Sequence, residues 1–198
     1  MSYLVRRISK GKWPSEEDIN SDESNNLIQL VKADAITACL KTHENTLSTW
    51  VVENVDEESL KKAVIALFTN NKQTKLNKVD IVYFPTNMLE EKNLELEDYP
   101  GDTVVKEYID SHKNISNLSY DKLGKFGEII LDCLKSERHI LMNEKKVKRI
   151  ILEAIDRNII KPKDLHLEMQ EYLKLDKILN TLGVEMIRNA SGEFVEKK

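Results

Sequence analysis

The sequence predicts an α+β protein, with a small mixed sheet and helices in the N-terminal half and a helical C-terminal half that ends in a β-hairpin. Three observations support this class. Alternating or β-branched segments lie before residue 87, apolar residues at helical spacing dominate after residue 102, and two short apolar segments near the C-terminus flank turn residues. We therefore divide the chain into an α+β domain, an acidic connecting loop and a helical domain with the hairpin, at residues 1–87, 88–102 and 103–198.

The first strand is predicted over Tyr3–Ile8, which is short and apolar apart from two arginines. Because successive side chains of a strand point to opposite faces, Arg6 and Arg7 are expected on opposite faces of the sheet. One of them then points inward or toward an edge. Apolar residues at helical spacing behind a polar, acidic start predict a short helix over Ser24–Val31.

A hairpin is predicted from two alternating segments joined by polar turn residues, Ile36–Leu40 and Leu47–Val52. Asp56 is expected to cap a helix, because apolar residues follow it at the spacing of one buried helical face. The β-branched and aromatic segment Val79–Phe84 predicts a strand that is covered on both faces and stopped by Pro85.

The C-terminal half is predicted to be mostly helical, with helices that begin after Asp102, Ser119, Asn143 and Pro162. The apolar residues of Leu175–Leu182 extend or restart the last of these helices. A hairpin over Val184–Val195 follows. Helices followed by a hairpin also match the order of a winged-helix fold, so this shape is an alternative for the last third of the chain.

Composition excludes several classes of protein. Hydrophobic residues make up 40% and charged residues 32% of the chain, which is within the range of sequences that fold. No apolar run approaches the roughly 20 residues of a membrane helix, and no leader-like segment opens the chain, so we expect a cytosolic protein without membrane contact. The two cysteines, Cys39 and Cys133, are expected to be buried free thiols. The His and Cys spacings fit no metal site, and no glycine-rich phosphate loop is present, so we expect neither a metal nor a cofactor.

Charge is unevenly distributed around the net value of −4. The first thirteen residues are basic and the segment that follows them is acidic, so these blocks neutralise each other or leave a small basic site for phosphate or an acidic partner. A second acidic segment lies in the predicted connecting loop. The residues that we expect to bind partners are Arg6, Arg7, Lys10, Lys12, Glu90, Glu91, Glu95, Glu97 and Asp98.

Two alternatives involve nucleic acids. Asp80 in an apolar strand, followed by Glu90 and Lys92, resembles in order the carboxylates and lysine of a Mg²⁺-dependent nuclease, in which the carboxylates hold the metal and the lysine helps to activate water. A winged-helix DNA-binding protein would instead use basic residues of the C-terminal half, namely Lys148, Arg149 and Arg188. His43, beside Glu44 in a predicted turn, is an additional candidate general base.

None of these catalytic patterns has a convincing sequence context. We therefore expect a non-enzymatic component of a cytosolic complex that acts through protein contacts, as a subunit, adaptor, inhibitor or immunity-type partner. The acidic segment is expected to bind a basic partner. The Mg²⁺-dependent nuclease and nucleic acid binding through the C-terminal half remain as alternatives.

Overall fold

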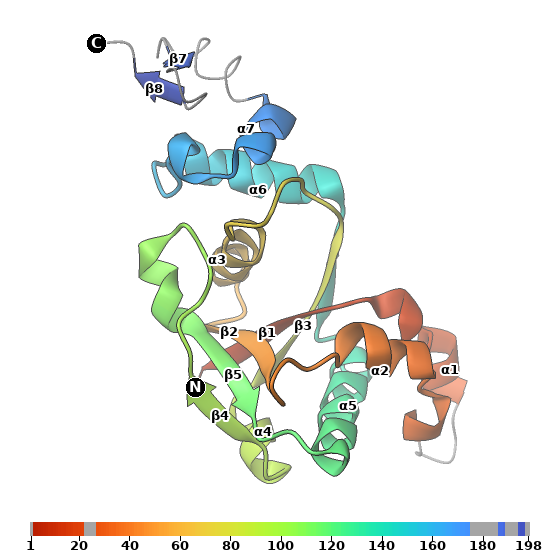
Figure 1. Cartoon of the computed structure of the whole chain (residues 1–198). Helices are drawn as coiled ribbons and strands as arrows, with labels where there is room; N and C mark the ends of the chain where they lie inside the picture. The colour runs from red at the N-terminus through yellow and green to blue at the C-terminus, as the bar shows by residue number, and fades with distance from the viewer. Residues whose placement is uncertain (1, 22–26, 175–185, 189–193, 197–198) are drawn as a thin grey trace.

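The structure is a computed structural model that describes residues 2–21, 27–174, 186–188 and 194–196. A six-stranded sheet forms its centre, in the order β4-β5-β2-β1-β3-β6, and every neighbouring pair is antiparallel (Figure 1). The sheet is therefore larger than predicted and antiparallel rather than mixed. Its strands are β1 (Tyr3–Ile8), β2 (Leu47–Val52), β3 (Val79–Pro85), β4 (Glu95–Asp98), β5 (His112–Ser116) and β6 (His139–Met142).

Helices cover both faces of the sheet, so the fold has three layers (Figure 1). One face carries α3 (Glu57–Phe68), α6 (Glu144–Asp156) and α7 (Leu167–Leu173), and the other carries α1 (Glu16–Ser21), α2 (Ala33–Cys39) and α5 (Tyr120–Lys135). The short α4 (Asn87–Glu91) connects β3 to β4. Short 3₁₀ helices are η1 (Lys10–Lys12), η2 (Leu27–Leu30), η3 (Lys106–Ser111) and η4 (Pro162–Asp164).

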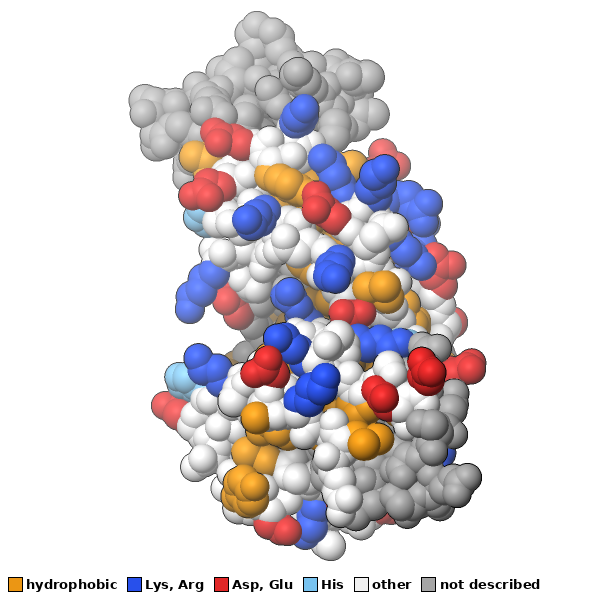
Figure 2. All heavy atoms as spheres, turned by 90° about the vertical axis from the view of Figure 1, so that its right-hand side faces the viewer, with side chains coloured by type: hydrophobic (Ala, Val, Ile, Leu, Met, Phe, Trp, Pro, Cys, Tyr) orange, Lys and Arg blue, Asp and Glu red, His pale blue; other side chains and the backbone are white. Residues whose placement is uncertain are grey.

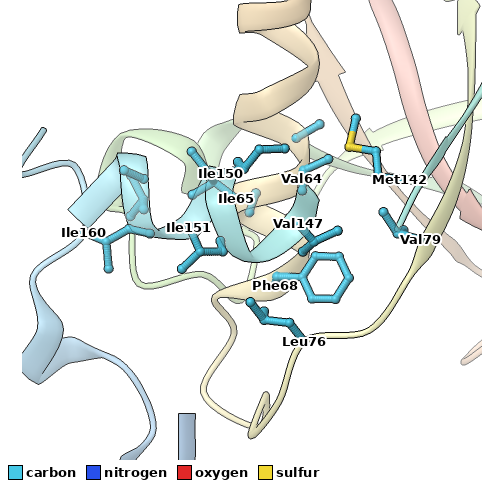
Figure 3. Close-up of a cluster of buried hydrophobic side chains, with 14 of the residues drawn as sticks. Val64, Ile65, Phe68, Leu76, Val79, Met142, Val147, Ile150, Ile151 and Ile160 are labelled. Carbon is cyan, nitrogen blue, oxygen red and sulfur yellow. The ribbon is translucent and has the colours of Figure 1, made fainter. Parts of the chain in front are cut away.

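Each face of the sheet has its own apolar core. The core beneath α3 and α6 contains Phe68, which lies beside Val147 and Leu76 (Figure 3). The core on the opposite face contains Phe84 and Phe126, whose rings meet edge to face at a centroid distance of 5.8 Å. Two cores explain why β3 reads as a nearly continuous apolar run, because both of its faces are buried.

Several predicted elements are confirmed, most of them helices with a clear cap. The Asp56 side chain accepts a hydrogen bond from the Ser59 amide at 2.8 Å, and α3 begins at the next residue after this cap. Ser119 and Asn143 cap α5 and α6 in the same way. The strand over Tyr3–Ile8, the strand that ends at Pro85 and the two buried free cysteines are also as predicted.

Other elements differ from the prediction. The segment Ile36–Leu40, predicted as a strand, belongs to α2 and its C-cap, and the helix buries Ala35 and Cys39, one turn apart. Apolar residues at every second position fit both structures here, and the alanines favour the helix. The predicted loop 88–102 contains part of α4 and all of β4, whose side chains are all exposed, so no apolar alternation marks it.

The C-terminal half is less helical than predicted, because β5 and β6 complete the sheet. Strands on both sides of the 88–102 segment therefore join one sheet. Near the end of the chain, β7 (Met186–Arg188) and β8 (Phe194–Glu196) pair antiparallel, as a hairpin does. The helix predicted over Leu175–Leu182 lies outside the described residues, and a winged-helix arrangement is not confirmed. In the part of the chain that the structure describes, no helix is both long and apolar enough to cross a membrane.

Candidate functional site

A cleft opens in the sheet where β1 and β2 diverge. The pairing of these strands ends at Val5 and Trp50. Beyond this point β1 continues to pair with β3 as far as Ile8, and β2 continues to pair with β5 as far as Leu47. The two strands thus follow different neighbours. A cavity of about 400 Å³ lies between them, and we call it the β1–β2 cleft; its lining is Val5, Arg6, Arg7, Ile8, Ser9, Ala38, Cys39, Ser48, Trp50 and Leu67.

Arg6 crosses this cleft and holds its two walls together. Its guanidinium donates hydrogen bonds to the backbone carbonyl of Ser48, at 2.6 Å, and to that of Cys39, at 2.5 Å. The guanidinium carbon lies 6.0 Å from the centre of the Phe126 ring. Arg6 as a whole keeps some exposure, whereas its Nε is buried and has no hydrogen-bond partner. Arg6 is thus the inward-pointing arginine that the sequence predicted.

Among the residues that the structure describes, no carboxylate pairs with the charge of Arg6. None of the ion pairs in the described part of the chain involves Arg6 or Arg7. Burial lowers the pKa of the Arg6 guanidinium to about 10, which still leaves it protonated at neutral pH. A partly buried charge is normally paired, because desolvation penalises it otherwise. The cleft therefore has the electrostatics of an anion site.

Arg7 approaches the cleft from the opposite face of the sheet. It is exposed, and its guanidinium carbon lies 5.7 Å from the centre of the Phe68 ring. The cleft is also lined by Cys39, whose sulfur accepts hydrogen bonds from the Ser9 amide at 3.0 Å and from the Trp13 indole at 3.3 Å. The two arginines thus supply positive charge from both faces, while the thiol is held by two N–H donors.

A second, smaller cavity of about 260 Å³ shares Ser48, Trp50 and Leu67 with the cleft. It adds Lys72 and His112 among its lining residues. The His112 ring meets the Trp50 ring edge to face, with a centroid distance of 4.9 Å, and its Nδ1 lies 2.9 Å from the Tyr99 carbonyl oxygen. Burial lowers the pKa of His112, although this hydrogen bond opposes the shift. Trp50 therefore forms a wall common to both cavities.

The structure does not bring the proposed nuclease residues together. Asp80 lies at the start of β3, where its carboxylate is 3.4 Å from the Lys10 amide, whereas Glu90 and Lys92 lie beyond the other end of that strand. The strand from Asp80 to Pro85 alone spans roughly 17 Å. Lys92 pairs with Glu128 at 2.6 Å, and this hydrogen bond raises the pKa of Lys92. Among the described residues, no group of three or more His, Cys, Asp or Glu side chains is placed to hold a metal ion.

The other predicted binding residues are dispersed. Glu95, Glu97 and Asp98 lie on β4, an edge strand of the sheet, and Glu90 and Glu91 lie on α4. Lys122 and Asn117 bind the Glu95 carboxylate and lower its pKa. Asp98 pairs with Lys113. The acidic residues of β4 are thus partly neutralised by neighbouring lysines.

The remaining basic and histidine candidates also have defined surroundings. Lys12 pairs with Asp34 at 3.0 Å, and the Lys10 ammonium lies 2.8 Å from Nε2 of His139. Lys148 lies over the Tyr172 ring, at 5.1 Å from its centre, and Arg149 pairs with Glu153 at 3.5 Å. Arg188 lies in β7. His43 is exposed in the turn before β2.

Sequence analysis identified Arg6 and Arg7 but missed the residues that form the rest of the cleft. Ser48, Trp50 and Leu67 come from β2 and α3, and Cys39 comes from the end of α2. No spacing in the chain relates these residues, because their proximity depends on where the pairing of β1 with β2 stops. A partial signal was present in two adjacent arginines within an otherwise apolar strand.

Comparisons with protein-family models, with curated proteins and with solved structures each found no match to this chain.

Proposed function

We propose that the protein is a non-enzymatic binding component that receives an anionic group of its ligand, a phosphate or a carboxylate, in the β1–β2 cleft. The observation that carries this proposal is the Arg6 guanidinium, which is partly buried in a cavity and has no acidic partner among the described residues. Guanidinium groups suit such ligands because their fixed N–H donors match the oxygens of phosphates and carboxylates.

The chemistry of the lining favours binding over catalysis. The described residues that line the cleft include two arginines but no His, Asp or Glu. His112 and Asp102 lie in the neighbouring cavity, where the His112 ring is bound to the Tyr99 carbonyl. The proposal gives the non-enzymatic component expected from the sequence a specific ligand site.

Isothermal titration calorimetry with inorganic phosphate, acetate and a nucleoside monophosphate tests the proposal and separates phosphate from carboxylate recognition. Arg6→Met removes the charge and retains most of the apolar stem. We expect it to weaken binding at least about tenfold, since a hydrogen bond to a charged group contributes about 1.5–3 kcal/mol. Arg7→Gln changes an exposed side chain of the same cleft and is expected to weaken binding less.

Lys12→Gln is the matched control, because Lys12 is a cation of the same N-terminal segment that pairs with Asp34 outside the cleft lining. Far-ultraviolet circular dichroism establishes whether Arg6→Met is folded. If it is not, Arg7→Gln carries the test. The proposal is wrong if none of the three anions binds, or if the folded Arg6 and Arg7 variants bind as tightly as the Lys12 control.

A further inference from the structure

Two groups of lysines in this protein differ in their ion pairing. Near β4 and α5, each of four lysines pairs with an acidic side chain of the same region; these are Lys92, Lys113, Lys122 and Lys125. In contrast, no ion pair within the described residues involves the exposed or partly exposed Lys78, Lys145 and Lys146. Ion pairs thus neutralise the lysines of the first region but not these three lysines.

The unpaired cations lie at one end of three neighbouring strands. Ile8 at the end of β1 pairs with Asp80, and Val79 at the start of β3 pairs with Met142 at the end of β6. Lys78, the residue before β3, therefore lies near the end of β6. Lys145 and Lys146 follow that end of β6 in the chain. Figure 1 shows these strand ends on one side of the molecule. Figure 2 faces that side and shows many Lys and Arg side chains over its middle and upper part, with Asp and Glu side chains among them.

Arg7 connects this region to the β1–β2 cleft. Its guanidinium lies over Phe68. The Phe68 ring in turn lies beside Val147, which follows Lys146 directly, and beside Leu76, two residues before Lys78 (Figure 3). We call Arg7, Lys78, Lys145 and Lys146 together the basic end. It continues the positive charge of Arg6 across the ends of β1, β3 and β6.

The acidic residues of β4 are too distant to cancel this charge. β4 and β6 form opposite edges of the six-stranded sheet. Five strand spacings separate them, which is roughly 24 Å, whereas ionic strength of 0.15 M screens exposed charges over about 8 Å. Two acids lie at the same end, Asp80 and Glu144, and they offset two of its four cations. The basic end therefore keeps an excess of positive charge despite the net charge of −4.

We infer that the basic end and the β1–β2 cleft together bind the backbone of a single-stranded nucleic acid, an inference that rests on the proposed anion site. A row of cations over three strands matches a repeating anion better than a single one. The cleft of about 400 Å³ has the size of a small-molecule site, so it admits one phosphate with its sugar and not a duplex. Contacts to phosphates position the strand without reading its sequence.

Fluorescence anisotropy with a labelled single-stranded oligonucleotide of about a dozen nucleotides tests this inference over a range of salt concentrations. The variant combines Lys78→Gln, Lys145→Gln and Lys146→Gln. The matched control combines Lys113→Gln, Lys122→Gln and Lys125→Gln, which removes the same charge from the paired group. Because each phosphate contact contributes about 0.7 to the slope of log affinity against log salt, we expect the variant to lower the magnitude of the slope by about 2. The control should leave the slope unchanged.

Additional binding measurements show whether the nucleic acid inference or the proposed anion site is wrong. Binding of inorganic phosphate without binding of the oligonucleotide overturns this inference and leaves the proposed function standing. Loss of both overturns both. Tighter binding of a poly-glutamate peptide than of the oligonucleotide assigns the surface to an acidic protein and contradicts nucleic acid binding, as does an equal slope for the variant and the control. A duplex of the same length should bind more weakly than the single strand.

Discussion

One added methyl group at Gly101 should perturb the packing of the protein strongly. A Cβ at this residue would lie 2.5 Å from Cη2 of Trp50, 2.9 Å from Cζ3 of the same ring and 2.8 Å from Cβ of His112. Carbon atoms pack at about 3.5–4.0 Å, so the Gly101→Ala variant requires a displacement of roughly 1 Å in at least one neighbour. The backbone at Gly101 has no positive φ, so packing alone is responsible for the effect.

Neither neighbour moves easily. Trp50 is 5% exposed and lies against the His112 ring, which belongs to a residue that is 7% exposed. Both residues are also held in the sheet by the pairing of β2 with β5. We therefore expect Gly101→Ala to lower the free energy of unfolding by about 2–3 kcal/mol, in the upper part of the usual range for overpacking. For a chain of this length the melting temperature should fall by about 4–12 °C.

Gly124→Ala is the control, because a Cβ at this residue of α5 meets no atom within 4 Å. Alanine is the better helix former, so this variant should be more stable than the original chain by about 0.5–1 kcal/mol. Urea unfolding, followed by circular dichroism and tryptophan fluorescence, measures both changes. Equal stability of the two variants, or a stabilised Gly101→Ala, would refute the packing argument. Gly101→Ala should also weaken anion binding, since Trp50 lines the cleft.

Two further predictions concern stability. Asn143→Ala removes the cap of α6, in which the side chain accepts a hydrogen bond from the Lys146 amide at 2.8 Å, and should cost about 1 kcal/mol in urea unfolding; an unchanged midpoint would contradict the cap. Because burial lowers the pKa of His112, the unfolded chain binds a proton more readily, and the free energy of unfolding should fall as the pH drops below about 6.5. His112→Gln should reduce this loss, and an identical pH profile for the variant would show that another group is responsible.

The elements that were predictable from the sequence carry local signals. The caps Asp56, Ser119 and Asn143 each precede a long amphipathic helix, and a hydrogen bond from the side chain to a nearby amide fixes where the helix begins. β3 was predictable because it is buried on both faces and Pro85 stops it. In these segments the local preference and the tertiary environment favour the same structure.

The strands that escaped prediction lack such signals. β5 buries polar side chains, among them His112, Asn114 and Ser116, so its inward residues do not read as apolar. β6 has four residues, too few to display a period, and it becomes a strand only because β3 offers a free edge. β4 is exposed throughout. Its acidic residues suit an edge strand, since charge there discourages pairing with other chains.

The cleft was even less predictable from the sequence, because it forms where β1 and β2 stop pairing with each other and continue to pair with different neighbours. Arg6 was identifiable as an unusual residue of an apolar strand, but its environment depends on Ser48 and Cys39, which lie 42 and 33 residues away. Only the tertiary fold brings the carbonyls of Ser48 and Cys39 within reach of the Arg6 guanidinium. Periodicity and spacing cannot report where two strands stop pairing.

Strand order also explains why the total charge is a poor guide to the partners of this protein. A net charge of −4 argues against nucleic acid binding only if acids and bases are mixed on the surface. In this sheet the acidic β4 forms one edge, and its charges meet Lys113 and Lys122, whereas Lys78 and Lys145 lie near the opposite edge without a described acidic partner. Acids that are already paired and lie more than two screening lengths away subtract from the total charge but hardly from the local potential. The local arrangement of charge, and not its sum, therefore determines which ligands approach the β1–β2 cleft.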